Sequence, residues 1–307
     1  MTALSLVLHV LVLVVVPPLL PGIVNRVKAV AAGRRGPPTL QLYRDLFRLV
    51  HKGAVYGHGT SWVFRAGPVV SLATALAAGA LLPLGGRTAP LSFGGDLVAF
   101  AGLLALGRFF TVAAALDTGS AFEGMGASRE ATFGALAEPV LLLVLALLCA
   151  AAGGAGFSEV LEPVGAGAAL SRPVLVVAAA ALFVVLLAEN ARIPVDDPNT
   201  HLELTMIHEV MVLDHSGPDL AFIEYGAAVK LLLFAALLVH LVLPFPQSPA
   251  LGALVLLAGV GVTAAAVGVT ESTMARLRLR RVPQLLVSAG ALAALGLAVV
   301  LQRGATP

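Results

Sequence analysis

The sequence is poor in charged residues and has almost no cysteine, and both shortages narrow the class of protein. Only 12% of its 307 residues are charged, whereas 59% are hydrophobic, and the mean hydropathy is +0.97. Long apolar runs of this kind exclude a water-soluble fold and indicate an integral membrane protein. The single cysteine, Cys149, excludes internal disulfides and any cluster ligated by several cysteines of this chain.

The sequence also lacks the short motifs that mark most enzyme active sites. It contains no P-loop, no dinucleotide-binding glycine pattern, no nucleophile motif and no internal repeat. The segment HEVMV at 208–212 lacks the second histidine of a zinc-protease helix. His9 and His240 both lie in apolar runs, but nothing else in the sequence indicates a haem pocket between them. The charged residues within and beside the apolar runs are therefore the candidates for function.

Eight apolar stretches are long enough to cross a bilayer. They are residues 3–24, 67–84, 97–117, 131–152, 174–190, 221–243, 250–270 and 284–302. The first has neither the positive segment nor the small-residue cleavage site of a signal peptide, so we expect a retained span. The sequence predicts an all-α integral membrane protein, in which residues 1–307 form a single transmembrane domain with about eight transmembrane helices.

Lysine and arginine are distributed unevenly between the segments that connect these stretches. Fourteen lie on the side of loops 25–66, 189–220 and 271–283, against only three on the other side. Because positive residues favour the cytoplasmic side, we predict that these loops are cytoplasmic and that both termini face outward. The expected location is the cell membrane.

The first of these loops contains a segment with amphipathic character. Residues 40–52, LQLYRDLFRLVHK, have apolar residues on one side and basic residues on another. This pattern is typical of a basic helix at the membrane surface. For the arginines alone, an anchor for lipid headgroups is the simpler interpretation.

Acidic residues are concentrated in one stretch of the chain. Residues 188–224 hold eight of the seventeen acidic residues and one basic residue, Arg192. A capping-box pattern, Thr200 with Glu203, marks the start of a helix, and a Gly-Pro pair marks its end. The spacing predicts a helix over residues 200–215.

On a helical wheel, the predicted helix has an apolar arc that includes two carboxylates. Glu203 and Asp214 fall inside this arc, whereas His201, His208 and His215 fall on the opposite side. An ionised carboxylate in an apolar setting must be paired or must take up a proton. We therefore expect the two carboxylates to handle protons and the three histidines to face water.

Several charged residues fall within the predicted spans. Glu138 lies about 13 Å along its helix from Arg129, and so inside the bilayer, where a charge costs roughly 2.5–3.5 kcal/mol. Arg108, in the preceding span, could simply neutralise it. Glu224 and Lys230 are about 120° apart around their helix, so we expect them to have different partners.

Four sequence blocks carry a family resemblance. They are RRGPP…LQLYRDLFRLVHK after the first span, SREATFGALAEP at 128–139, AENARIPVDDP…HLELT…LDHSG in the acidic stretch, and ESTMARLRLRRVP at 271–283. Together with the eight-span layout, they resemble the membrane subunit shared by respiratory complex I (its subunit 1 or H subunit) and by energy-converting nickel–iron hydrogenases and formate hydrogenlyases (subunit 4). The segments THLELTMIHE and DTGSAFEGMGASRE resemble the hydrogenase branch more closely.

The resemblance implies a role for the chain and for its partners. In this family the subunit has no redox centre, and it anchors an electron-transfer arm to an ion-pumping membrane arm while its buried carboxylates couple redox chemistry to proton or sodium movement. The implied partners are hydrogenase-like large and small subunits and iron–sulfur proteins on the cytoplasmic side, which carry the nickel–iron centre and the clusters, and antiporter-like membrane subunits. No nucleic acid is expected.

The resemblance also assigns roles residue by residue. Glu138 matches the buried glutamate of the fourth span, Glu189 and Arg192 match an AE-NR pair, and Asp196 or Asp197 matches a following aspartate. The candidate ion-coupling residues are Arg108, Glu138, Glu189, Asp196, Asp197, Glu203, Asp214, Glu224 and Lys230. The candidate docking residues are Arg34, Arg35, Asp45 and Arg192. No metal ligands are expected in this chain.

Two other classes of function remain open at this stage. An autonomous proton or cation transporter could use the same buried carboxylates, although the sequence has no inverted repeat. An inert membrane anchor could use them only to hold partner subunits. Ion transport by the isolated chain would indicate the first, whereas co-purification with soluble iron–sulfur proteins would indicate a subunit of a larger complex.

Overall fold

The computed structural model describes residues 2–84, 88–165, 172–196, 206–246 and 248–304, and within these ranges the chain forms helices and no strand. The helices are α1 (Ala3–Val15), α2 (Leu19–Ala31), α3 (Gln41–Val50), α4 (Trp62–Leu81), α5 (Asp96–Asp117), α6 (Ala121–Ala152), α7 (Phe157–Gly165), α8 (Arg172–Glu189), α9 (His208–Met211), α10 (Gly217–Val242), α11 (Pro249–Thr273), the 3-10 helix η1 (Leu279–Arg281) and α12 (Val282–Gly304). The predicted all-α membrane fold is confirmed.

The apolar stretches all lie in helices. Within the described ranges, α4, α5, α6, α10, α11 and α12 are each long and apolar enough to cross a membrane. The pair α1 and α2 meets the same criterion as one bent unit, and the apolar part of α8 is shorter. These segments agree with the prediction of about eight spans.

The first predicted span is bent where two prolines follow each other. Helix α1 ends at Val15, α2 begins at Leu19, and the two axes differ by 52°. Pro17 and Pro18 have no N–H to donate to the carbonyls of the preceding turn, so a continuous helix is broken there. The helix then resumes and runs to Ala31, past the predicted end of the span at residue 24.

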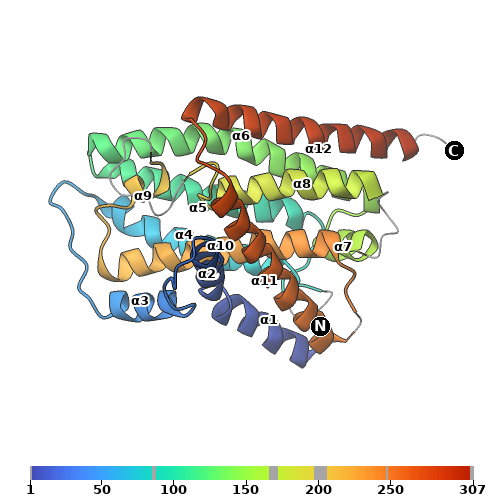
Figure 1. Cartoon of the computed structure of the whole chain (residues 1–307), viewed down its shortest axis with the longest axis horizontal. Coiled ribbons are helices and arrows are strands. Elements are labelled where there is room, and N and C mark those ends of the chain that lie inside the picture. Colours follow the sequence, from blue (N-terminus) through green and yellow to red (C-terminus); the bar gives the residue numbers. More distant parts are fainter. Residues whose placement is uncertain (1, 85–87, 166–171, 197–205, 247, 305–307) are drawn as a thin grey trace.

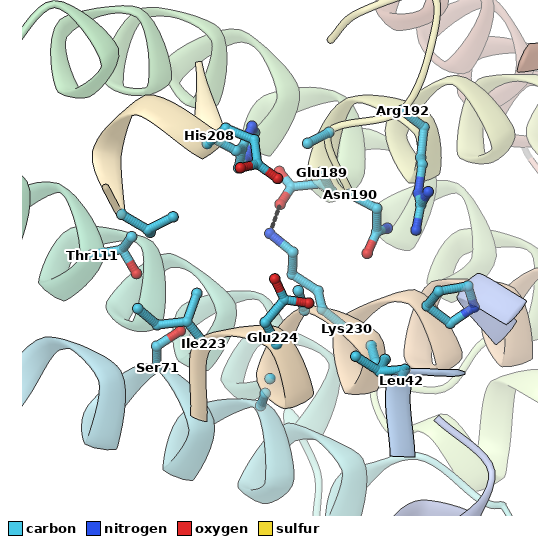
Figure 2. A pocket seen from close by; sticks show the side chains of 18 of the residues that line it. Leu42, Ser71, Thr111, Glu189, Asn190, Arg192, His208, Ile223, Glu224 and Lys230 are labelled. Atoms are coloured by element: carbon cyan, nitrogen blue, oxygen red, sulfur yellow. Dashed lines mark ion pairs between the residues drawn. The ribbon is translucent and has the colours of Figure 1, made fainter. Parts of the chain in front are cut away.

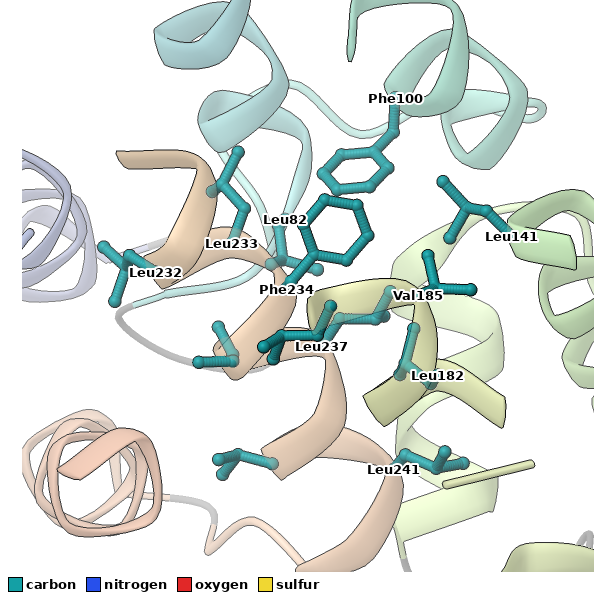
Figure 3. Packing of buried hydrophobic residues seen from close by; sticks show 14 of the residues in the cluster. Leu82, Phe100, Leu141, Leu182, Val185, Leu232, Leu233, Phe234, Leu237 and Leu241 are labelled. Carbon is teal, nitrogen blue, oxygen red and sulfur yellow. The ribbon is translucent and has the colours of Figure 1, made fainter. Parts of the chain in front are cut away.

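Helix α10 lies at the centre of the bundle. Of the residues in its most apolar 18-residue segment, 72% are buried. Phe234 is fully buried, with its ring centroid 6.4 Å from that of Phe100 on α5, and it belongs to one core cluster with Leu182 of α8 and Leu141 of α6 (Figure 3). This packing fixes α10, and therefore the position of Lys230 one turn earlier, against its neighbours.

The connecting segments are sorted between the two ends of the bundle. Figure 1 shows α3 and α9 at one end, and α7 with both chain termini toward the other. At the α7 end, two buried histidines hold the segment after α4: His9 Nδ1 accepts the N–H of Leu84 at 3.3 Å, and His240 Nε2 donates to the carbonyl of Pro83 at 2.7 Å. These contacts give His9 and His240 a role in packing.

The amphipathic helix predicted within residues 40–52 is present as α3. None of its residues is buried, and Arg44, Phe47 and Arg48 are exposed. The Tyr43 hydroxyl donates to the carbonyl of Val15 at the end of α1, which ties α3 to the bent first span. Helix α3 also packs against α10, so it forms part of the bundle surface.

The predicted helix over residues 200–215 is wrong in the part that the structure describes. Residues 200–205 lie outside the described ranges, and beyond them only His208–Met211 is helical before the chain turns. Asp196 Oδ2 accepts the backbone N–H groups of Ile207 and His208 at 3.2 Å each, so a carboxylate from the preceding loop caps this helix. Within residues 206–215, contacts from outside the segment thus override the local helix signals.

Candidate functional site

A cavity of about 460 Å³ lies between α2, α3, α4, α5, α9, α10 and the end of α8. Its described lining includes acidic and basic residues, which come from α3, α5, α6, α8, α9 and α10 and from the turn after α8. They are Asp45, Arg108, Glu130, Glu189, Arg192, His208, Glu209, Glu224 and Lys230. Figure 2 shows Lys230 and Glu224 projecting from α10 toward Glu189 and His208. A cavity with this lining inside an apolar bundle is the natural candidate for the site of function.

Arg108 is the centre of the charged cluster. It lies about 18 Å along α5 from Asp96, and only 9% of its side chain is exposed. Its guanidinium pairs with Glu189, with Glu138 at 2.9 Å and with Glu130 at 3.2 Å. One side chain of α5 therefore binds carboxylates from α6 and α8.

A glycine makes room for this arrangement. Gly134 lies on α6 between Glu130 and Glu138, and a Cβ at this position would overlap the Nη1 and Cζ atoms of Arg108. Glu130 and Glu138 are eight residues apart, which places them on the same face of α6 on either side of Gly134. The absence of a side chain at residue 134 allows the guanidinium to lie against the helix between them.

The charges of this cluster do not balance if every carboxylate is ionised. Arg108 and Lys230 supply two positive charges, and Lys230 Nζ lies 3.6 Å from Glu189 Oε2. Glu130, Glu138 and Glu189 supply three negative charges. A carboxylate that lies among apolar helices favours a further cation close by. The cluster can therefore accommodate one more positive charge.

A second group of charges links this cluster to the acidic loop. Asp196, which is almost fully buried, lies 2.8 Å from Arg276 and 3.6 Å from His208 Nδ1. His208 Nε2 in turn lies 3.2 Å from Glu130. Burial raises the pKa of the Asp196 carboxyl, but His208 and Arg276 outweigh it and hold this pKa below its usual range.

A third group joins the ends of α2 and α11 to the turn after α8. Glu271 has a fully buried side chain, and its carboxylate lies 2.7 Å from Lys28 Nζ and 3.5 Å from Arg192 Nη1. The turn before Arg192 has Ala191 in the left-handed conformation, with the Arg192 N–H bonded to the carbonyl of Leu187. This turn directs Arg192 toward Glu271.

The structure brings together four of the predicted coupling residues, Arg108, Glu138, Glu189 and Lys230. Glu138 is less buried than predicted, because 39% of its side chain is exposed, and its pairing with Arg108 is the alternative that the sequence left open. Lys230 pairs with Glu189, whereas Glu224 lines the cavity. The two charged residues of α10 therefore have different surroundings.

The remaining predicted residues lie apart from the Arg108 cluster. Asp45 borders the cavity from α3 and pairs with Arg48, while Arg34 and Arg35 are exposed in the segment before α3. Asp214 is exposed, so its predicted position in an apolar arc is wrong. Asp197 and Glu203 lie outside the described residues, as does His201.

The prediction that the histidines face water is also wrong where the structure describes them. His208 lies between two carboxylates, and His215 is 5% exposed and stacks on Phe64 with a centroid distance of 4.0 Å. The helical wheel rests on the assumption that apolar residues face the protein and polar residues face water. Here the inner side borders a cavity that is lined by polar residues. Polar residues on such a segment can therefore face inward.

Sequence reasoning missed Glu130, Lys28, Glu271 and Arg276 as members of these ion pairs. Glu130 was visible in the block SREATFGALAEP, eight residues before Glu138 and therefore on the same helix face. Glu271 was visible as the only acidic residue near the end of an apolar run followed by four arginines. Neither signal identifies the partner, which comes from another part of the chain.

Comparisons with known proteins place the chain in a family. The family described as NADH dehydrogenase matches residues 3–302. Formate hydrogenlyase subunit 4 of Escherichia coli K12 is 34% identical over 292 residues, which cover 93% of this chain and 94% of that protein. The chain belongs to the NADH dehydrogenase family. The resemblance inferred from the four sequence blocks is thereby confirmed.

Other relatives agree with this assignment. Hydrogenase-4 component C of Escherichia coli K12 is 34% identical over 273 residues, covering 86% of this chain and 85% of that protein. A chain in the structure of the membrane-bound sulfane sulfur reductase, an archaeal respiratory membrane complex, has the same fold, with a TM-score of 0.81, 20% identity, and coverage of 96% of this chain and 99% of that one. The chain is a multi-pass membrane protein whose relatives are subunits of membrane complexes.

Proposed function

We propose that this chain is the non-redox membrane subunit of a multisubunit oxidoreductase of the hydrogenase or formate hydrogenlyase type. In this proposal it anchors the electron-transfer arm and couples redox chemistry to the movement of protons or sodium ions. The observation that carries the coupling part is the cluster in which Arg108 binds Glu130, Glu138 and Glu189 beside a cavity. Buried ionisable residues in membrane bundles usually mark ion pathways.

The positions of the three carboxylates support a direction for the coupling path. Glu130 and Glu189 line the cavity, whereas Glu138 is outside its described lining and is 39% exposed. A charge change on the cavity side would alter the hold of Arg108 on Glu138, because all three carboxylates share the same guanidinium. The exposed part of Glu138 would then offer an exit toward a neighbouring membrane subunit of the antiporter-like kind.

The first prediction tests coupling with isosteric changes. Glu189→Gln and Glu138→Gln should each leave the complex assembled but lower the number of ions moved per electron pair by about tenfold or more, because a positioned proton-transfer residue contributes at least about 10²-fold. Gln keeps the size and the hydrogen bonding of Glu and loses the titratable proton. The measurement is redox-driven ion uptake in inverted membrane vesicles, normalised to redox turnover.

The matched control is Glu123→Gln, which makes the same change in α6, the helix of Glu138. Glu123 is 1% exposed, and its carboxylate accepts the Asp214 N–H at 3.1 Å, away from Arg108. This variant should keep the normal coupling ratio. If Glu189→Gln and Glu138→Gln also keep it, the carboxylates only hold the subunit together, and the inert-anchor alternative is correct.

The second prediction concerns the docking surface, which we propose to be cytoplasmic and formed by loops 25–66, 189–220 and 271–283. A photo-crosslinking residue in place of Phe47 on α3 or of Leu213 after α9, both exposed, should capture soluble iron–sulfur proteins. The same residue in place of Phe93, exposed near α7, should not. Mass spectrometry of the products identifies the partners. Capture mainly from Phe93 would reverse the orientation, and capture of lipid alone at Phe47 would make α3 a headgroup anchor.

A further inference from the structure

His208 lies at the junction between the acidic loop and the Arg108 cluster. Its Nε2 is 3.2 Å from Glu130 Oε2, and its Nδ1 is 3.6 Å from Asp196 Oδ2. Glu130 belongs to α6 and pairs with Arg108, whereas Asp196 belongs to the loop after α8 and pairs with Arg276. A single imidazole thus connects a carboxylate of the membrane bundle with a carboxylate of the loop.

The backbone holds this imidazole in position. Asp196 Oδ2, the atom that faces Nδ1, also accepts the N–H groups of Ile207 and His208 at 3.2 Å each. The side chain borders the cavity, and 27% of it is exposed. Both ring nitrogens are themselves buried against the two carboxylates, so His208 can exchange a proton with the cavity only when the ring turns Nε2 away from Glu130.

The surroundings of His208 favour its charged form, in contrast to those of His215. Burial lowers the pKa of His208, but the carboxylates of Glu130 and Asp196 outweigh it and raise this pKa above the ordinary 6.5. Burial lowers the pKa of His215 and exceeds the opposing effects of Asp219 and Asp214. His208 thus changes protonation at a higher pH than His215.

Charged groups face His208 from each element packed around it. They are Glu130 of α6, Asp196 of the loop, Glu189 at the end of α8, Lys230 of α10 and, through its pair with Glu130, Arg108 of α5. The carboxylates favour the imidazolium, and the Lys230 ammonium opposes it. A positive His208 would also supply the charge that balances the excess carboxylate of the cluster.

We propose that His208 is a proton-carrying residue that transfers protons between the cavity and Glu130. This inference rests on the proposed coupling function, to which it adds a residue at the entrance of the carboxylate cluster. In the imidazolium, the Nε2–H bond breaks as the proton binds Glu130 Oε2. The products are a neutral imidazole, with its remaining proton on Nδ1 facing the ionised Asp196, and a neutral Glu130 carboxyl. Once the ring turns Nε2 from Glu130 into the cavity, a hydronium ion returns a proton to Nε2 and leaves water, so no electron is transferred.

The test compares His208→Gln with His215→Gln in inverted vesicles that carry the assembled complex. In the unmodified protein, the coupling ratio should fall as the pH rises through the pKa of His208, because the imidazolium is lost. His208→Gln should lower the ratio by about tenfold at neutral pH and should abolish this pH-dependent fall, since Gln does not titrate. His215→Gln makes the same change at a nearby and more buried histidine. This variant should keep both the ratio and the pH dependence.

A measurement on the unmodified chain covers the case in which His208→Gln fails to fold. In the full-length chain in lipid nanodiscs, nitrogen NMR of labelled histidine should show an imidazole with a pKa above the ordinary value. Glu130→Gln should lower that pKa, because it removes one of the two carboxylates that raise it. An absence of any histidine that titrates above its ordinary range would overturn the proposal.

The outcomes separate this proposal from the coupling function itself. If Glu189→Gln and Glu138→Gln lose coupling while His208→Gln keeps the ratio and its pH dependence, only the role of His208 is wrong. If His208→Gln lowers redox turnover and coupling equally at every pH, the residue is a structural contact, and the proposal is again wrong. If the two glutamate variants keep coupling, the coupling function fails whatever His208→Gln shows.

Discussion

Arg108→Gln should lower the free energy of unfolding by about 3–5 kcal/mol, the usual cost of removing one partner from a buried ion pair. The guanidinium is 9% exposed and pairs with three carboxylates, of which Glu189 is the most buried, with 3% of its side chain exposed. Among the described residues, the other cationic partners of these carboxylates are Lys230, for Glu189, and His208, for Glu130. Equilibrium unfolding of the full chain in mixed micelles measures the loss.

Arg108→Lys should recover only part of this stability. A lysine ammonium is a compact charge on a flexible stem, whereas the planar guanidinium presents donors in several fixed directions at once. Arg108 uses Nε for Glu130, Nη1 for Glu138 and Nη2 for Glu189, so each carboxylate meets a different nitrogen. The lysine variant should therefore retain charge but lose at least one of the three contacts.

The control for this prediction is an arginine in an exposed ion pair. Arg48 pairs with Asp45 on α3, and 66% of its side chain is exposed. Arg48→Gln should change stability by no more than about 1 kcal/mol, because solvent screens such pairs. In a double-mutant cycle, Arg108→Gln with Glu189→Gln should cost less than the sum of the two single changes. Strict additivity would mean that the pair contributes nothing.

Glu271→Gln should also be strongly destabilising, by roughly 3–5 kcal/mol, because it leaves two cations without their shared carboxylate. The Glu271 side chain is fully buried, and its partners Lys28 and Arg192 are 24% and 12% exposed. These ion pairs join the ends of α2 and α11 to the turn after α8. We therefore expect the turn to open and Arg192, which borders the cavity, to become accessible.

Two measurements check this prediction. Unfolding in mixed micelles gives the loss of stability, and labelling of a cysteine introduced at Asn190, in a cysteine-free background with Cys149 replaced, reports opening of the turn. Lys28→Met in the Glu271→Gln background should restore part of the stability, since it removes one of the stranded charges. If labelling is unchanged and the two changes are additive, the group formed by Glu271 and its two partners does not close this end of the cavity.

The spans could be predicted because a segment that crosses lipid must be apolar over its length, and such a run is visible in the sequence itself. Each of the eight apolar stretches is helical over most of its length, since a backbone in a bilayer must satisfy its own hydrogen bonds. The bend of the first span also had a local cause in Pro17 and Pro18. The sidedness of the loops stays a prediction, because it depends on the membrane and not on contacts within the chain.

The helix over residues 200–215 shows where local signals stop being sufficient. The capping-box pattern and the apolar arc were present in the sequence, but Asp196 caps the short helix that begins at His208, and Glu123 of α6 binds the Asp214 N–H. Both contacts come from outside the segment. A wheel drawn for one helix cannot include them, so it gave His208 and Asp214 the wrong surroundings.

The sequence by itself determined that this is a helical membrane protein, that an acidic stretch interrupts it, and that its blocks match one family. It also required that charges such as Arg108 and Glu138 have partners, because an isolated charge in a bilayer is costly. Only the tertiary structure decided which partners they have. Arg108 and Glu189 are 81 residues apart, and Asp196 and Arg276 are 80 apart. Pairing at such separations depends on how helices pack around a shared cavity, and no spacing within one segment records it.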